Sequence, residues 1–103
     1  MYAVVRLNTW DAAKRDAAAA DVAEFDRIHA EQPGFLESLV VDLGGSRHLT
    51  VNLWESEDQA TQALPVMGPA VGRLLEPLLA QPSQLIGTGE VVQGGEVLGT
   101  GRA

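Results

Sequence analysis

The segment from Arg47 to Trp54 alternates between two kinds of side chain, and this alternation constrains the fold more than any other feature of the chain. One row is aliphatic: Leu49, Val51 and Leu53. The other row is His48, Thr50, Asn52 and Trp54. Side chains two residues apart lie on the same face of a strand, so the pattern predicts a strand with two different faces. We expect the aliphatic row to pack on helices and the other row to lie on the open face of the sheet.

The segments around this strand predict the element order β-α-β-β-α-β. Strands are expected over residues 2–8, 35–43 and 85–92, from their apolar and β-prone side chains. Helices are expected over 16–31, which contains four consecutive alanines, and after the capping box that begins at Ser56, with an interruption near 65–69. This order is typical of a ferredoxin-like α+β fold, whose antiparallel sheet carries helices on one face.

We expect residues 1–103 to form one such domain, with 99–103 as a flexible tail. Trp10 falls in the connection between the first strand and the first helix, where the context is polar, so we expect its side chain to be exposed.

Composition excludes several classes of function. The formal net charge is −7, and seven Lys and Arg residues are scattered among fourteen Asp and Glu residues. Nucleic acids and anionic membrane surfaces need a basic patch, so neither is an expected partner. The chain has no cysteine, which suits a reducing compartment, and it has neither a signal-peptide pattern nor an apolar run near the roughly 20 residues of a membrane helix. A cytoplasmic location is therefore expected.

The open face of the predicted sheet carries a mixture of apolar and polar side chains. On the first strand, Tyr2, Val4, Arg6 and Asn8 share the face of the Trp54 row. An exposed apolar patch of this kind usually marks an interface or a ligand site. Two copies packed face to face would cover the patch and enclose a central cavity. Its expected polar lining is Arg6, Asn8, His48, Thr50 and Asn52.

Three sequence elements together resemble a known family. Pro33-Gly34-Phe35 opens the second strand, a glycine-containing hairpin follows, and the third strand ends in Trp54-Glu55-Ser56-Glu57-Asp58-Gln59-Ala60. Over nearly the whole chain, this pattern resembles the antibiotic biosynthesis monooxygenase domain of the dimeric α/β-barrel superfamily. The resemblance implies a ferredoxin-like homodimer whose two sheets form a barrel. It also implies one of several activities, including cofactor-independent oxygenation of aromatic polyketides, quinol oxygenation and haem degradation.

The residues discriminate between these activities. Asn8 matches the strand asparagine of the haem-degrading branch, but the tryptophan and haem-ligating histidine of that branch would fall near Ala63 and Arg73. Haem degradation is therefore not expected. The polyketide oxygenases use Asn, Trp, Tyr and Arg side chains, and by this resemblance the expected catalytic residues are Asn52, Trp54 and Arg6. No cofactor is expected, and no cluster of His, Asp or Glu has the spacing of a metal site.

Each catalytic candidate has a structural alternative. Asn52 could stabilise an enolate or peroxide oxygen of a substrate, or could form a hydrogen bond across strands or across a dimer. Trp54 could stack on a flat aromatic substrate, or could pack at the dimer edge. Arg6 could bind an anionic substrate, or could form an ion pair with Glu37 or Asp42.

The remaining candidates are substrate-binding residues: Tyr2, Asn8, His48, Thr50 and Arg73. His48 could act as a base near neutral pH, or could be a solvent-exposed residue of the hairpin. Arg73 could reach the cavity from its helix, or could lie on the surface. His29 is expected only to complement a helix dipole. Two functions stay open: a cofactor-independent oxygenase of a small aromatic or quinol-type compound, and a non-catalytic dimeric module that binds a small molecule or serves assembly.

Overall fold

A computed structural model describes residues 1–93, and the predicted tail at 99–103 lies outside these described residues. The elements along the chain are β1 (Tyr2–Thr9), α1 (Ala12–Ala17), α2 (Ala19–Ala30), β2 (Phe35–Gly44), β3 (Arg47–Trp54), α3 (Glu57–Gln62), α4 (Leu64–Ala70), the π-helical turn η1 (Val71–Leu75), the 3-10 turn η2 (Glu76–Leu78) and β4 (Gln84–Glu90). The predicted β-α-β-β-α-β order is confirmed. None of the helices in residues 1–93 has the length and apolar character that crossing a bilayer requires.

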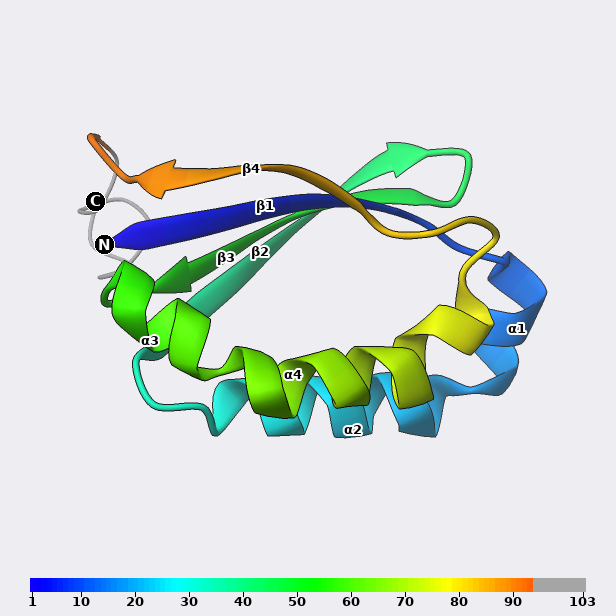
Figure 1. Ribbon diagram of the computed structural model, residues 1–103. Helices are drawn as coiled ribbons and strands as arrows, with labels where there is room; N and C mark the ends of the chain where they lie inside the picture. Colours follow the sequence, from blue (N-terminus) through cyan, green and yellow to red (C-terminus); the bar gives the residue numbers. More distant parts are fainter. Residues whose placement is uncertain (94–103) are drawn as a thin grey trace.

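The strands form one antiparallel sheet in the order β2-β3-β1-β4. Val51 lies at its centre, opposite Val5 of β1 and Leu39 of β2. All helices lie on one side of this sheet (Figure 1). The predicted ferredoxin-like α+β fold is therefore confirmed, and the sheet of the single chain is open rather than closed into a barrel.

The first helical region differs from the expected single helix over 16–31. It is two helices, α1 and α2, which meet at Ala18 (φ −118°, ψ 35°). The helical region begins earlier than predicted because the Asp11 carboxylate accepts a hydrogen bond from the Lys14 backbone N–H at 3.1 Å. The predicted exposure of Trp10 is wrong: its side chain is 8% exposed and packs against Leu75 and Leu78.

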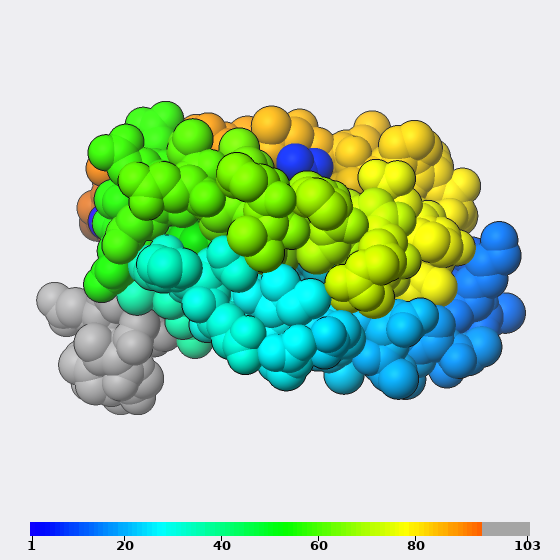
Figure 2. Space-filling model, turned by 60° about the horizontal axis from the view of Figure 1, so that its bottom comes forward, coloured from blue at the N-terminus to red at the C-terminus, as the bar shows by residue number. Residues whose placement is uncertain are grey.

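The second helical region begins at the predicted capping box. The Ser56 hydroxyl accepts from the Gln59 backbone N–H at 3.2 Å. The interruption falls at Ala63 rather than near 65–69. Pro65 does not break the helix because it lies in the first turn of α4, where backbone N–H groups form no hydrogen bond within the helix. Pro77 has no backbone N–H to donate a hydrogen bond to the preceding turn. The second helical region ends in η1 and η2. Figure 2 shows α2 (cyan) side by side with residues 64–78 (green to yellow).

The predicted assignment of the two faces is wrong. Trp54 is 4% exposed and packs against Ala63 and Met67 of the helical layer. Its row therefore faces the helices, and Leu49 and Val51 lie half-buried on the face that no described helix covers (Figure 1). The physical reason is that polar side chains of this row line a cavity between the sheet and the helices, so their polarity does not mark the face opposite the helices. We call Val4, Arg6, Asn8, His48, Thr50, Asn52 and Trp54 the inner row.

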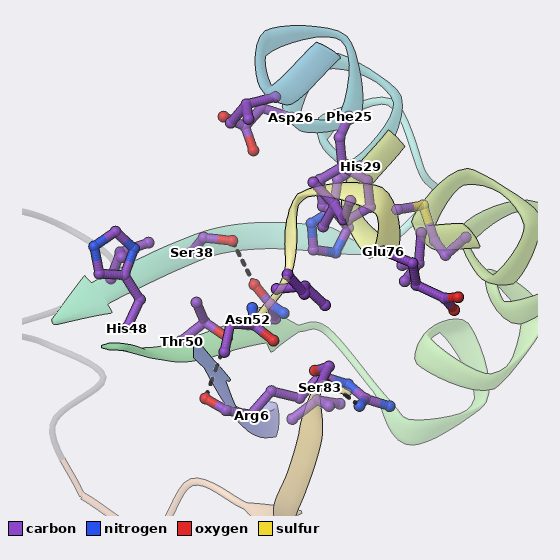
Figure 3. Close-up of a pocket in the computed structure, with 18 of the residues that line it drawn as sticks. Arg6, Phe25, Asp26, His29, Ser38, His48, Thr50, Asn52, Glu76 and Ser83 are labelled. Carbon is purple, nitrogen blue, oxygen red and sulfur yellow. Dashed lines mark hydrogen bonds between the residues drawn. The ribbon is translucent and has the colours of Figure 1, made fainter. Parts of the chain in front are cut away.

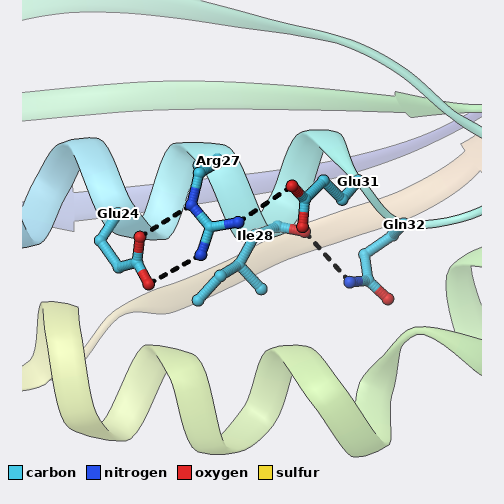
Figure 4. A network of polar contacts seen from close by, with 5 residues as sticks. All are labelled: Glu24, Arg27, Ile28, Glu31 and Gln32. Carbon is cyan, nitrogen blue, oxygen red and sulfur yellow. Dashed lines mark hydrogen bonds and ion pairs between the residues drawn. The ribbon is translucent and has the colours of Figure 1, made fainter.

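The outer side of α2 carries a surface ion-pair network (Figure 4). The Arg27 guanidinium lies 2.8 Å from a Glu24 carboxylate oxygen and 2.9 Å from one of Glu31. Its hydrogen bond lowers the pKa of Glu24. Exposed pairs of this kind contribute little to stability, so the network chiefly identifies the solvent-facing side of α2. The opposite side of the helix faces the sheet.

Candidate functional site

A cavity of about 810 Å³ lies between the sheet and the helices of a single chain (Figure 3). Its floor is the inner row of β1 and β3. Its walls include apolar side chains from the helical layer: Val22, Phe25, Met67, Val71 and Leu75. Cavities of about 300–1,000 Å³ with mostly apolar walls and a few polar groups are typical of small-molecule sites. The space is large enough for a bicyclic or tricyclic aromatic compound.

The cavity brings most of the predicted site residues together, but in a different place from the one expected. Its lining includes Arg6, Asn8, His48, Thr50, Asn52 and Trp54. Tyr2 is not in the lining and instead packs against the cluster that contains Trp54. Arg73 is exposed on η1 and does not line the cavity either. The cavity lies between the sheet and the helices of one chain, whereas these side chains were expected to line a central cavity between the sheets of two copies.

Asn52 is held from the neighbouring strand. Its side-chain oxygen accepts a hydrogen bond from the Ser38 hydroxyl of β2 (Figure 3). Beside it, the Thr50 hydroxyl lies 3.5 Å from the Arg6 backbone carbonyl. Ser38 forms the one hydrogen bond of the Asn52 side chain within residues 1–93, so the two amide N–H groups have no partner there. They are available to an oxygen atom of a ligand.

Asn8 is a buried amide with an unmet hydrogen-bonding requirement. Its side chain is 8% exposed, and its Oδ1 atom has no hydrogen-bond partner in the described part of the chain. An unsatisfied buried acceptor costs about 1–3 kcal/mol. A hydroxyl group of a ligand in the cavity would supply the missing donor.

His48 is fixed by a residue that the sequence did not suggest. The Trp10 indole Nε1–H donates to His48 Nδ1 at 3.2 Å, so the neutral imidazole carries its proton on Nε2. The Arg15 guanidinium carbon lies 4.9 Å from the centre of the Trp10 ring. Arg6, Asn8 and Trp10 are spaced two residues apart, which is the strand period and places all three on one face. This spacing is the sequence signal that indicates the inward direction of Trp10.

His29, given no functional role from the sequence, also lines the cavity. The side chain is 8% exposed, and the centre of its ring lies 4.3 Å from that of Phe35 and 5.6 Å from that of Trp54. Burial lowers the pKa of His29 to about 4, so the imidazole is neutral at pH 7. Its spacing from Phe25, four residues along one helix face, was the signal that could have indicated an inward position.

Comparisons with known proteins give the fold but no sequence family. No family model and no curated protein matches the chain. Solved structures do match. The protein named "Putative antibiotic biosynthesis monooxygenase" from Nitrosomonas europaea is similar with a TM-score of 0.71 and 11% identity, covering 90% of this chain and 100% of that one. A second match is SnoaB, a cofactor-independent oxygenase from Streptomyces nogalater, with a TM-score of 0.69 and 20% identity, covering 89% of this chain and 93% of SnoaB.

A conserved protein from Methanosarcina mazei Go1 is similar to the same extent, with a TM-score of 0.71, 14% identity and coverage of 86% of this chain and 90% of that one. Identities this low establish shared architecture and leave substrate and activity open. The chain therefore has the ferredoxin-like fold of the antibiotic biosynthesis monooxygenase proteins, as its sequence resemblance predicted.

Proposed function

We propose that this protein is a cofactor-independent monooxygenase that acts on a small aromatic, polyketide or quinol-type compound bound between the sheet and the helices. The observation that carries the proposal is the composition of the cavity. Its walls are apolar and aromatic, while Asn8 and Asn52 offer polar atoms that have no partner within residues 1–93. The shared fold with SnoaB adds support at the level of architecture.

The proposed chemistry uses electrons supplied by the substrate. An anthrone, for example, loses a proton from its CH₂ group to give an enolate, and the enolate reduces O₂. One oxygen atom of O₂ becomes the carbonyl oxygen on the former CH₂ carbon, and the other leaves as water. The overall reaction is anthrone + O₂ → anthraquinone + H₂O. The Asn52 N–H groups would stabilise the enolate oxygen, because hydrogen-bond donors aimed at a developing negative charge lower the barrier. Trp54 would contact the flat ring system.

The first test is the variant Asn52→Ala. We expect its rate of anthrone oxidation under air to fall by about a hundredfold, because the enolate oxygen loses its donors. Oxygen uptake and anthraquinone absorbance give the rate. Gln62→Ala, on the exposed surface of α3, is the control and should keep the wild-type rate. An unchanged rate in a folded Asn52→Ala variant would contradict the proposed role.

A second candidate is non-catalytic binding of the same class of compound. The hydrogen bond from Trp10 to His48 favours it, since the bond occupies the imidazole nitrogen that would otherwise accept a proton. Saturable binding of anthrone, without oxygen uptake above the protein-free rate, would select this function.

We further propose that the protein is a homodimer joined through the face of the sheet that no helix of residues 1–93 covers. This outer face carries aliphatic side chains on three strands: Ala3, Val5, Leu7, Leu39, Val41, Leu49 and Val51. Such a face is a suitable surface for a second copy, because apolar area buried in the interface contributes about 25 cal/mol per Å² before the costs of association.

The variant Val51→Lys should convert the dimer to a monomer, because it places a charge at the centre of the outer face. Light scattering would give the mass in solution. Leu64→Lys is the matched control, because Leu64 is exposed on α4 and lies away from this face. A dimer mass for Val51→Lys, or a monomer mass for the wild type, would contradict the proposed interface.

A further inference from the structure

Arg6 is a cation of the cavity lining, and no carboxylate of residues 1–93 lies within salt-bridge distance of its guanidinium. Its side chain is partly buried, and its only side-chain hydrogen bond within residues 1–93 runs from Nη1 to the Ser83 hydroxyl at 3.4 Å (Figure 3). The ion pair with Glu37 or Asp42 that the sequence allowed is not formed. Glu37 lies opposite Leu53 and therefore on the other face, while the Asp42 carboxylate accepts from the Gly44 N–H at 2.8 Å.

The other arginine of the lining differs from Arg6 in its surroundings. Arg15 stacks over the Trp10 ring. Its charge also lowers the pKa of Asp26, although burial has the larger effect and raises that pKa. Glu76 is in the lining too, but no cation in the described part of the chain lies within salt-bridge distance of its carboxylate. Neither arginine forms an ion pair within residues 1–93, and Arg15 Nε is buried without a hydrogen-bond partner there. Arg15 does have the Trp10 ring and the nearby Asp26 carboxyl, whereas the described contact of the Arg6 guanidinium is the Ser83 hydroxyl.

An uncompensated charge in a partly desolvated site is costly, and an anion that pairs with it removes the cost. We propose that the ligand of this cavity is an aromatic compound that carries a carboxylate, with Arg6 as its counter-ion and the Ser83 hydroxyl beside it. The aromatic part of the ligand rests on the proposed function. The guanidinium fork matches a carboxylate with two parallel hydrogen bonds.

Asn8 extends the site along the same face of β1. It is the next inward residue after Arg6, and its Oδ1 atom lacks a donor. Residues two apart on one strand are separated by about 7 Å, within the span of a substituted naphthalene. A ligand hydroxyl near the carboxylate would therefore reach Asn8 while the carboxylate pairs with Arg6.

The test uses naphthalene-2-carboxylate and its uncharged methyl ester as probes, with tryptophan fluorescence as the binding signal. We expect the wild type to bind the carboxylate about 10- to 100-fold more tightly than the ester, the range that hydrogen bonds to a charged group provide. Arg6→Gln should lose this preference and keep its affinity for the ester. Arg6→Lys should retain part of the preference, because it keeps the charge but not the fork.

Arg47→Gln is the matched control, because it removes the same charge from an exposed position of β3 outside the cavity. This control should bind both probes like the wild type. Equal affinities of the wild type for carboxylate and ester would overturn the proposal, as would an unchanged carboxylate preference in Arg6→Gln. If Arg6→Gln is less stable, retention of ester binding shows that its cavity is intact.

The same proteins separate this inference from the proposed oxygenase activity. Loss of carboxylate preference in Arg6→Gln, with no oxygen uptake by the wild type on anthrone, would support the anion site and refute the activity. Oxidation of anthrone by the wild type, with no carboxylate preference, would refute the anion site and support the activity.

Discussion

Replacing Trp54 with alanine is expected to lower the free energy of unfolding by about 3–5 kcal/mol, the usual loss for a large buried aromatic side chain. The indole is 4% exposed and joins the sheet to Ala63 and Met67 in the helical layer. It also contacts the aromatic rings of Phe35 and His29. Urea unfolding followed by circular dichroism would measure the loss without depending on the removed fluorophore.

Trp54→Phe is the informative companion variant. Phenylalanine keeps an aromatic ring at the junction of the two layers, so we expect it to retain most of the stability that alanine loses. A free energy of unfolding for Trp54→Ala within experimental error of the wild type would show that Trp54 does not hold the layers together.

The second large effect is a loss of stability as the pH falls from 7 toward 4. Burial lowers the pKa of His29 from 6.5 to about 4 in the folded chain. Between these values the unfolded chain binds the proton and the folded chain does not, so stability falls with falling pH. The full contribution is present above pH 6.5, and the total loss through this window is roughly 3 kcal/mol. Urea unfolding at a series of pH values would measure it.

His29→Gln should flatten this dependence, because the variant has no proton to bind at this position. Gln62→Ala, on the exposed surface of α3, is the control: it removes no titratable group and should keep the wild-type slope. Asp26 lies on the same helix and its pKa is raised by burial, so its contribution falls as the pH rises through its titration. The contribution of His29 is therefore taken from the difference in pH dependence between His29→Gln and the wild type, since both contain Asp26. The same slope for His29→Gln and the wild type would contradict the assignment to His29.

The strands could be predicted from the sequence because their signal is local and periodic. The strand from Arg47 to Trp54 has the predicted bounds, and its alternation set the register of the inner row. The helix breaks at Ala18 and Ala63 could not be predicted, since alanine is the strongest helix former and carries no sign of a break. These breaks depend on how the helices pack across the sheet.

The sequence predicts which strand residues of the candidate site share a face. It does not predict which side of the sheet that face occupies or which helix residues meet it. Arg6, Asn8 and Asn52 share a face because of strand period alone, whichever side of the sheet that face occupies. The choice of side was wrong because the burial of Trp54 outweighs the polarity of its neighbours, and sequence pattern does not weigh the two. His29 and Arg15 reach the cavity from the helical layer. The helical spacing of Phe25 and His29 indicates a shared face, but which strand residues that face meets depends on helix packing.

The position of the cavity within one chain has a consequence for stoichiometry. Each chain contains its own cavity, and the outer face of the sheet is separate from it. An assembly of two copies would therefore hold two ligands, one in each chain. A mixed pair made of one intact and one inactivated chain would keep one working site. If the proposed ligand binds in this cavity, the expected ratio is one ligand per chain, whatever the number of chains in the assembly.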